Sequence, residues 1–144
     1  MPRKVAKKVD KKVAYRDGGE PNEVEAIRLL FQKLVNSGVS YREVALSQDL
    51  VVNTVRYYFK GARDVDGATI GFMEKLISYI DSEGTNIHNL KNALEETLSS
   101  DTSSGLAKKT GATQQNIDLY KKGKLSLDKM TLGFAERLLY GRKK

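Results

Sequence analysis

The sequence contains no cysteine and a single histidine, and these two scarcities exclude much of the chemistry that proteins build on such side chains. Without cysteine, neither a disulfide nor a thiolate-ligated metal can form. One histidine leaves carboxylates as the remaining metal ligands, so a zinc site is not expected. We therefore expect neither a metal nor a cofactor.

Long hydrophobic runs are also lacking. No stretch approaches the ~18 consecutive apolar residues that a membrane span needs, and the start of the chain, Met1–Lys4, has no apolar signal-peptide core. Apolar residues still make up 40% of the sequence, which is enough for a core. We expect a cytoplasmic protein without a membrane partner.

Catalytic patterns are absent as well. The sequence offers no carboxylate pair, no glycine-rich phosphate loop and no setting for a nucleophile, so we do not expect an enzyme. Its charge is what stands out, because 25 Lys and Arg against 18 Asp and Glu give a net charge of +7 and a pI near 9.5. Such a surplus favours polyanionic partners, chiefly nucleic acid, although solubility alone would also explain it.

The chain repeats itself with a shift of 62 residues, which places Gly61 on Gly123 and Phe72 on Phe134. Other identical pairs are Ala45/Ala107, Tyr58/Tyr120, Thr69/Thr131, Gly71/Gly133 and Glu74/Glu136. A duplicated unit indicates a duplicated role, and each unit has a size at which a single core is only marginally stable. The two units are therefore expected to pack against each other and so stabilise each other.

Three segments follow from the repeat and from local composition: a basic arm at 1–21, a first unit at 22–82 and a second unit at 83–144. The arm is expected to be disordered in the free protein and to contact phosphates or a minor groove; a simple solubility tail is the alternative. Its candidate contacts are Arg3, Lys4, Lys7, Lys8, Lys11 and Lys12.

Helical periodicity and capping residues predict about four helices in each unit and no strands. In the first unit, Asn22 caps a helix to about Asn36, Ser40 caps a helix over 41–48, and a third helix runs from about 52 to 60. Asp64 is expected to cap the fourth helix, with Ile70, Met73, Ile77 and Ile80 facing inward. The second unit repeats this order at about 86–98, 102–110, 113–122 and 126–140.

The most specific local pattern runs from Leu106 to Lys124. Gly111 can adopt positive φ and so allows a sharp turn between two short helices. Thr113 caps the helix that follows, while Ile117 and Tyr120 hold that helix to the core and leave Gln114 and Gln115 facing outward. Two short helices joined by a tight turn make a helix-turn-helix.

This segment resembles the helix-turn-helix of the lambda-repressor-like family of phage repressors and Cro proteins. The resemblance extends through the repeat to the first unit, and it implies an all-α fold of two tandem helix-turn-helix units. It also implies a sequence-specific protein that binds double-stranded DNA as a transcriptional regulator, associated with the nucleoid. A weaker similarity, carried by the tandem arrangement, is to archaeal CRISPR-repeat-binding proteins.

The family resemblance assigns DNA-binding roles to particular residues of the second unit. Gln114 and Gln115 would read base edges, where a Gln amide suits adenine, and Asn116 lies beside them. Ser103 and Thr113 would contact phosphate, as would Lys121, Lys122 and Lys124.

The first unit departs from this pattern. Asp49 replaces the turn glycine but tolerates left-handed geometry, and Val51 falls on the cap position, so we expect Asn53 to cap instead. Tyr58 is expected in the core, as its repeat partner Tyr120 is. The candidate DNA contacts here are Tyr41, Arg42, Val52, Asn53, Thr54, Arg56, Tyr57, Lys60 and Arg63.

Two linked units let one chain do what helix-turn-helix proteins usually do as dimers. We therefore expect a monomer on an asymmetric duplex site with two unlike half-sites in successive major grooves, and no small-molecule effector. Whether the units lie head-to-tail or about a pseudo-twofold axis stays open. Two other classes also stay open: an antitoxin-like or adaptor-like module that binds a protein, and an RNA-binding protein.

Overall fold

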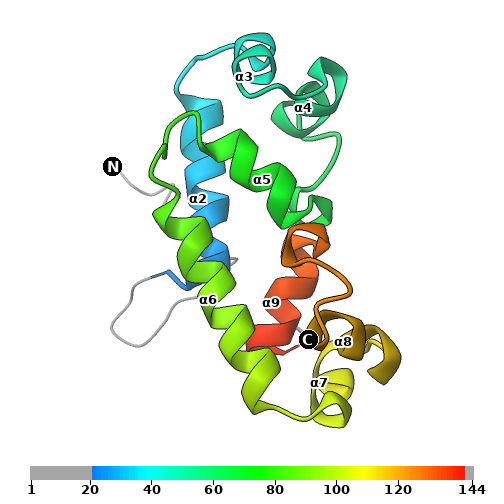
Figure 1. Cartoon of the computed structure of the whole chain (residues 1–144). Coiled ribbons are helices and arrows are strands. Elements are labelled where there is room, and N and C mark those ends of the chain that lie inside the picture. Colours follow the sequence, from blue (N-terminus) through cyan, green and yellow to red (C-terminus); the bar gives the residue numbers. More distant parts are fainter. Residues whose placement is uncertain (1–20, 142–144) are drawn as a thin grey trace, which may run out of the picture.

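The computed structural model describes residues 21–141, and within this range the regular elements are helices, with no β-strand (Figure 1). The α-helices are α2 (Glu23–Asn36), α3 (Tyr41–Ser47), α4 (Val52–Phe59), α5 (Ile70–Ile77), α6 (Thr85–Ser100), α7 (Ser103–Thr110), α8 (Gln114–Lys121) and α9 (Leu132–Tyr140). Two short 3-10 helices, η1 (Val65–Gly67) and η2 (Leu127–Lys129), precede α5 and α9. The predicted all-α class is confirmed. The predicted basic arm at 1–21 lies, apart from Pro21, outside the described residues.

The order of elements in the first half recurs in the second. A long helix, two short helices, a 3-10 turn and a final helix follow one another as α2–α3–α4–η1–α5 and again as α6–α7–α8–η2–α9. The repeated sequence therefore corresponds to a repeated arrangement of helices. Among the described residues, no helix is both long and apolar enough to cross a membrane.

Side-chain caps fix most helix starts where the sequence predicts them. Asn22 accepts a hydrogen bond from the Glu25 amide at 2.8 Å, and Ser40 accepts one from the Glu43 amide at 3.0 Å. Each bond satisfies one of the amides that the first turn of a helix leaves without a partner. The helices that begin at 23 and 41 are thus encoded by the residues immediately before them.

The predicted fourth helix of each unit needs correction. Asp64 and Ser126 cap only the 3-10 turns, whereas α5 and α9 begin after Thr69 and Thr131, whose hydroxyls accept from amides three residues on. Because each unit has two capping residues in series, the chain makes two short elements instead of one long helix. Ile80 lies beyond the end of α5 and is 38% exposed, so the prediction that it faces inward is wrong.

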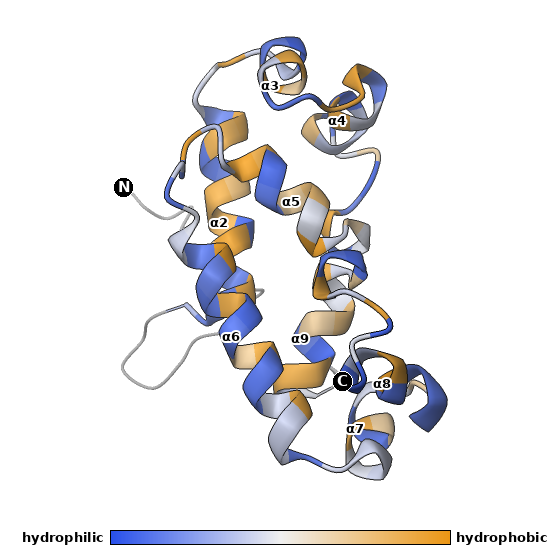
Figure 2. Ribbon diagram, in the orientation of Figure 1, coloured by the Kyte–Doolittle hydropathy of each residue, from blue (hydrophilic) through white to orange (hydrophobic). Residues whose placement is uncertain are grey.

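One hydrophobic core spans both halves. Helices α2 and α6 pack against each other, and α5 and α9 complete the centre of the molecule. Figure 2 shows the hydrophobic residues of these four helices gathered between them, while α8 is largely hydrophilic. The fully buried side chains come from both units and include Ile27, Leu34, Met73, Leu90 and Leu132. The predicted mutual support of the two units has this shared core as its physical basis.

Reciprocal backbone contacts relate the halves by a pseudo-twofold axis. The Ile70 amide donates to the Met130 carbonyl at 2.8 Å, and the Leu132 amide donates to the Ala68 carbonyl at 3.0 Å. Each bond becomes the other when the two halves are exchanged, as in an isologous interface. Thr69 and Thr131, which occupy the same place in the repeat, face each other in an antiparallel bridge. Of the two arrangements that the sequence leaves open, the structure has the pseudo-twofold one.

The recurring glycines Gly71 and Gly133 permit this close approach. A Cβ atom added to Gly71 would lie 3.1 Å from the Cβ of Asp128, and one added to Gly133 would lie 3.2 Å from the carbonyl oxygen of Asp66. Both distances are shorter than ordinary side-chain contacts, so the absence of a side chain lets each helix start lie against the other half's 3-10 turn.

Two clusters of charge accompany the axis. The Arg28 guanidinium bonds Glu136 of the other half at 2.7 Å, Glu25 at 2.6 Å and Asp66 at 2.8 Å. Burial lowers the pKa of Arg28, but the hydrogen bonds to Glu136, Glu25 and Asp66 outweigh that effect and raise it above its ordinary value. Arg28 thus stays charged at every accessible pH and ties α2 to α9.

Lys91 makes the corresponding contacts in the second half, with Asp128 and Glu74 in the places of Asp66 and Glu136. Its ammonium group lies 2.7 Å from Asp128 and 3.3 Å from Glu74. The glutamates that recur in the repeat, Glu74 and Glu136, are therefore both ion-paired across the halves.

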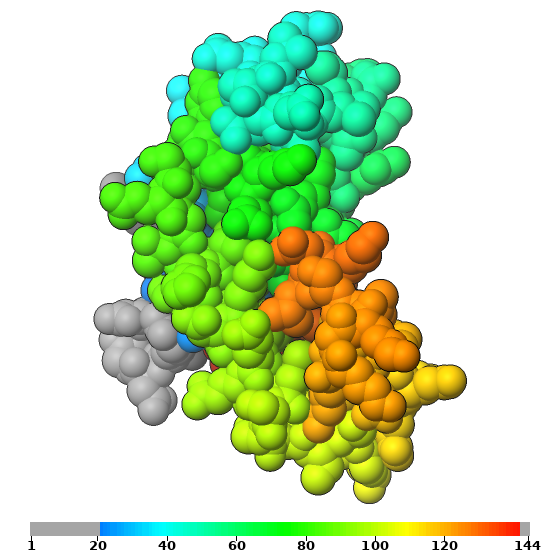
Figure 3. All heavy atoms as spheres, in the orientation of Figure 1, coloured from blue at the N-terminus to red at the C-terminus, as the bar shows by residue number. Residues whose placement is uncertain are grey.

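The two pairs of short helices lie at opposite ends of the molecule. Figure 1 shows α3–α4 at one end and α7–α8 at the other, with α5 and α9 between them. The space-filling view shows both pairs as projecting lobes beyond the central body (Figure 3). The core therefore presents two similar helix pairs at a fixed separation and orientation.

Candidate functional site

The turn between α7 and α8 has the geometry that its sequence predicts. Gly111 adopts φ +81° and its amide donates to the Ala107 carbonyl at 2.8 Å, which ends α7. Ala112 packs against the core, and the Thr113 hydroxyl accepts from the Asn116 amide at 3.1 Å, which starts α8. Three residues thus redirect the chain from one helix to the next.

Helix α8 is held by one side and free on the other. Ile117 is fully buried, and the ring of Tyr120 stacks on Phe134 with centroids 6.0 Å apart. Burial raises the pKa of the Tyr120 hydroxyl. Gln114 and Gln115 are exposed at the helix start, with Asn116 half-buried beside them. The two amides that the sequence singles out therefore project from a helix whose position the core fixes.

The polar residues around α8 differ in their exposure and in their hydrogen-bond partners. Lys122 and Lys124 are exposed. The ammonium group of Lys121 donates to the Asp101 carbonyl, and the Ser103 hydroxyl donates to the Asp118 carboxylate. Lys121 and Ser103 therefore already have partners within the chain.

The turn between α3 and α4 is built differently but follows the same path. Asp49 adopts φ +59°, the left-handed conformation that Gly111 has in the other turn. The Leu50 amide then donates to the Ala45 carbonyl at 2.8 Å. The prediction that Asp49 would preserve the turn is confirmed.

The start of α4 corrects another prediction. The helix begins at Val52, with Val51 at the cap position and no side-chain hydrogen bond there. Asn53 lies inside the first turn and is exposed, so it is not the cap that the sequence suggested. Val51 nonetheless has the extended conformation of a cap residue, with φ −70° and ψ 124°.

Aromatic residues of the first half divide between the core and the surface. Tyr58 is buried and its ring lies 5.2 Å from that of Phe72, as expected for a core residue. Tyr57 is 38% exposed, and the guanidinium groups of Arg56 and Arg63 lie over its ring at 5.9 and 4.9 Å. This stacking brings two cations together beside α4.

The remaining candidate residues of the first half lie on α3, α4 or the loop that follows. Tyr41, Val52 and Thr54 are half-buried, whereas Arg42, Asn53 and Lys60 are exposed. The candidates of the arm, Arg3, Lys4, Lys7, Lys8, Lys11 and Lys12, lie outside the described residues.

Two exposed apolar residues are not predicted by the sequence pattern. Leu46 on α3 and Val51 before α4 are each 67% exposed. The repeat carries the signal that could have found them, since a shift of 62 residues places Leu46 on Lys108 and Val51 on Thr113. An apolar residue at a position that is polar in the other unit marks a local difference in surface chemistry.

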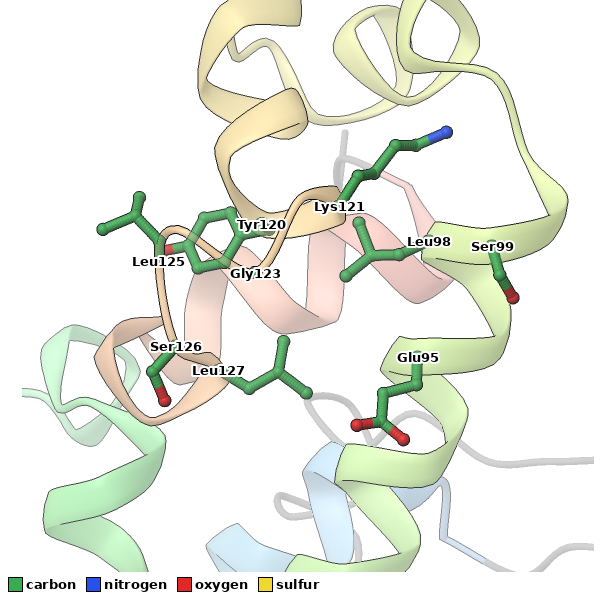
Figure 4. Close-up of a pocket in the computed structure, with 9 residues that line it drawn as sticks. All are labelled: Glu95, Leu98, Ser99, Tyr120, Lys121, Gly123, Leu125, Ser126 and Leu127. Atoms are coloured by element: carbon green, nitrogen blue, oxygen red, sulfur yellow. The ribbon is translucent and has the colours of Figure 1, made fainter.

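A hollow of about 460 Å³ lies between α6 and the segment from α8 to η2. Figure 4 shows Leu98, Tyr120 and Leu127 among its lining residues, with Glu95 and Ser99 on the α6 side. The polar groups of the lining are one carboxylate (Glu95), three hydroxyls (Ser99, Tyr120 and Ser126) and the ammonium group of Lys121. Among the described residues, no cluster of three or more His, Asp or Glu could hold a metal ion.

Comparisons with protein-family models, with curated proteins and with solved structures gave no match.

Proposed function

We propose that this chain binds double-stranded DNA in a sequence-specific way, with α3–α4 and α7–α8 as two helix-turn-helix units of the lambda-repressor-like type. In this proposal α4 and α8 are the recognition helices. The chain acts as a monomeric transcriptional regulator that meets two unlike half-sites in successive major grooves.

The observation that carries the proposal is the exposure of Gln114 and Gln115 at the start of α8. An amide side chain offers one donor and one acceptor group, which match N7 and N6 of adenine in the major groove. The helix that carries these amides is anchored by Ile117 and follows a glycine turn. A solvated helix face would also expose glutamines, but it would not require such a turn before them.

The pseudo-twofold relation between the halves is a second support. B-DNA has local twofold axes perpendicular to its own axis, so a pair of recognition helices related by a twofold can enter two major grooves in the same manner. Half-sites of such pairs lie about 10 base pairs apart, one turn of the duplex. Unlike residues on α4 and α8 would make the two half-sites differ in sequence.

In vitro selection from a random duplex pool with the full chain tests this proposal. We expect enrichment of sequences with two conserved blocks whose centres lie about one helical turn apart. A gel shift that compares the selected duplex with random duplex, single strand and structured RNA completes the test. Preference for RNA, or no enrichment of any duplex, would contradict the proposal. Enrichment of CRISPR repeats would place the chain in that narrower group.

A further inference from the structure

The residues that begin the two candidate recognition helices differ in polarity. Val51 and Val52 in the first unit stand where the second has Thr113 and Gln114. Val51 is 67% exposed, and Val52 follows it as the first residue of α4. The first unit thus presents aliphatic carbon at the place where the second presents a hydroxyl and an amide.

The presence of a valine at position 51 is not explained by a contribution to the stability of α4. A valine at the cap position leaves the first-turn amides without a side-chain acceptor, whereas Thr113 supplies one at the equivalent place. Nor does Val51 contribute much to the core, because two thirds of it remain exposed. A residue that lowers helix stability and gains little packing in the free protein suits a surface that is covered in a complex.

We propose that Val51, together with Val52, reads thymine in the half-site of the first unit by contact with its C5-methyl group. The inference rests on the proposed function and assigns a base preference to one unit. The thymine methyl is the apolar group that base pairs present in the major groove, and apolar side chains contact it there. Glutamine amides in the second unit and valines in the first would then read different bases.

The charge around Val51 favours DNA over a protein as the occupant of this surface. From α3 to the loop after α4 there are four cations and three acids: Arg42, Lys60 and Arg63 are exposed and Arg56 is half-buried, while Glu43, Asp49 and Asp64 are exposed. The Asp64 carboxylate accepts from the Asp66 amide. The Glu43 carboxylate is moreover occupied by the Tyr79 hydroxyl. A small apolar spot within a basic surface matches a methyl group within a phosphate-lined groove.

The experiment uses a duplex selected from a random pool by the full chain. The block whose recognition weakens in a Gln114→Ala, Gln115→Ala variant belongs to the second unit, so the other block belongs to the first. In that other block each thymine is replaced by deoxyuridine, which removes only the C5-methyl group. The wild-type chain should lose about fourfold in affinity for each contacted methyl, from the free energy of burying one apolar carbon.

Two variants make the test specific. Val51→Ser removes the methyl groups of Val51 and adds a capping hydroxyl, so it should fold. It should bind the thymine duplex more weakly and distinguish thymine from deoxyuridine less than the wild type does, with Val52 as the remaining apolar contact. Leu46→Ser changes an apolar residue of the same 67% exposure on α3 and should discriminate as the wild type does. Circular dichroism of each variant checks that the helices are kept.

Three outcomes would overturn the inference. Deoxyuridine could leave the affinity of the wild type unchanged, or Val51→Ser could discriminate thymine from deoxyuridine as strongly as the wild type does. The selected duplexes could instead contain only the block of the second unit, which would leave duplex binding intact and assign the surface around Val51 to a protein partner. Failure to enrich any duplex would contradict the proposed function as well.

Discussion

At the scale of single residues, the two turns show how different side chains produce one backbone path. Gly111 reaches φ +81° without a Cβ atom, whereas Asp49 reaches φ +59° as one of the few residue types that tolerate this conformation. The sequence permits both assignments because Asp49 aligns with Gly111 in the repeat. Chemistry at the surface is less constrained than backbone geometry, so the residues after the turn could diverge.

The paired variant Gln114→Ala, Gln115→Ala is expected to relax sequence specificity. Each lost bidentate contact should cost about 1–3 kcal/mol of discrimination against the wrong base. Competition gel shifts with the selected duplex and single-base variants measure it. Because both side chains are exposed, the variant should keep its stability. Unchanged discrimination would remove α8 from base recognition.

Substitution Arg28→Met is expected to destabilise the fold by about 3 kcal/mol, the cost of leaving a buried charge without its partner. The Glu25 side chain is only 6% exposed and would lose the cation 2.6 Å away. Urea unfolding followed by circular dichroism measures the change.

Lys91→Met is the matched control, since Glu74 and Asp128 are 47% and 51% exposed and can be solvated when the ammonium is removed. It should cost under about 1 kcal/mol. Equal effects of the two substitutions would contradict the difference in burial.

At the scale of elements, capping residues account for what the sequence predicts well and where it misleads. The starts of α2, α3, α7 and α8 follow directly from Asn22, Ser40, Thr102 and Thr113. The starts of α5 and α9 are predicted wrongly, because two cap residues stand in series and the local sequence does not indicate which of them begins the longer helix. In the structure, the longer helix α5 begins at Ile70, whose amide donates to the Met130 carbonyl of the other half. A sequence pattern cannot reveal this contact.

The candidate site is likewise predictable from the sequence only in part. Exposure of Gln114 and Gln115 follows from helical spacing relative to Ile117, a local property. The arrangement of the two helix pairs does not, because a repeat constrains each half and leaves their packing to Gly71, Gly133 and the charges around Arg28. Those residues are visible in the sequence, but their partners are far away along the chain.

Exchange of the two cap residues should move stability in opposite directions. Val51→Thr introduces an acceptor for the first-turn amides of α4 and should stabilise the chain by about 1 kcal/mol, while Thr113→Val should destabilise it by a similar amount. Thermal or urea unfolding measures both. If Val51→Thr is neutral or destabilising, packing of the valine outweighs the missing cap.

At the scale of the whole molecule, the two halves share one hydrophobic core. The core draws buried residues from every α-helix of the described range, and α2 packs on α6 across the halves. The expected units at 22–82 and 83–144 both contribute buried residues to this shared core.

Unfolding should accordingly proceed in a single transition. Urea curves followed by far-ultraviolet circular dichroism and by tyrosine absorbance should coincide, as they do for two-state domains of this size. Tyrosines in both halves, including Tyr58 and Tyr120, report on each. Two separate transitions would indicate that the halves are independently stable.

Net charge leads to a prediction about salt. If the two units together neutralise about six phosphates, the logarithm of the affinity should fall with the logarithm of salt concentration with a slope of about −5. Titrations of the selected duplex at several salt concentrations give this slope. A slope near zero would contradict binding to the phosphate backbone.

The bridge between Thr69 and Thr131 at the pseudo-twofold axis has an evolutionary consequence. In a symmetric homodimer every substitution occurs in both subunits, so the two subunits cannot differ in sequence. Joining both copies in one polypeptide removes that restriction while the central contacts hold the geometry. The residues at positions 51 and 49 could then come to differ from their repeat partners Thr113 and Gly111, while the two halves keep their pseudo-twofold arrangement.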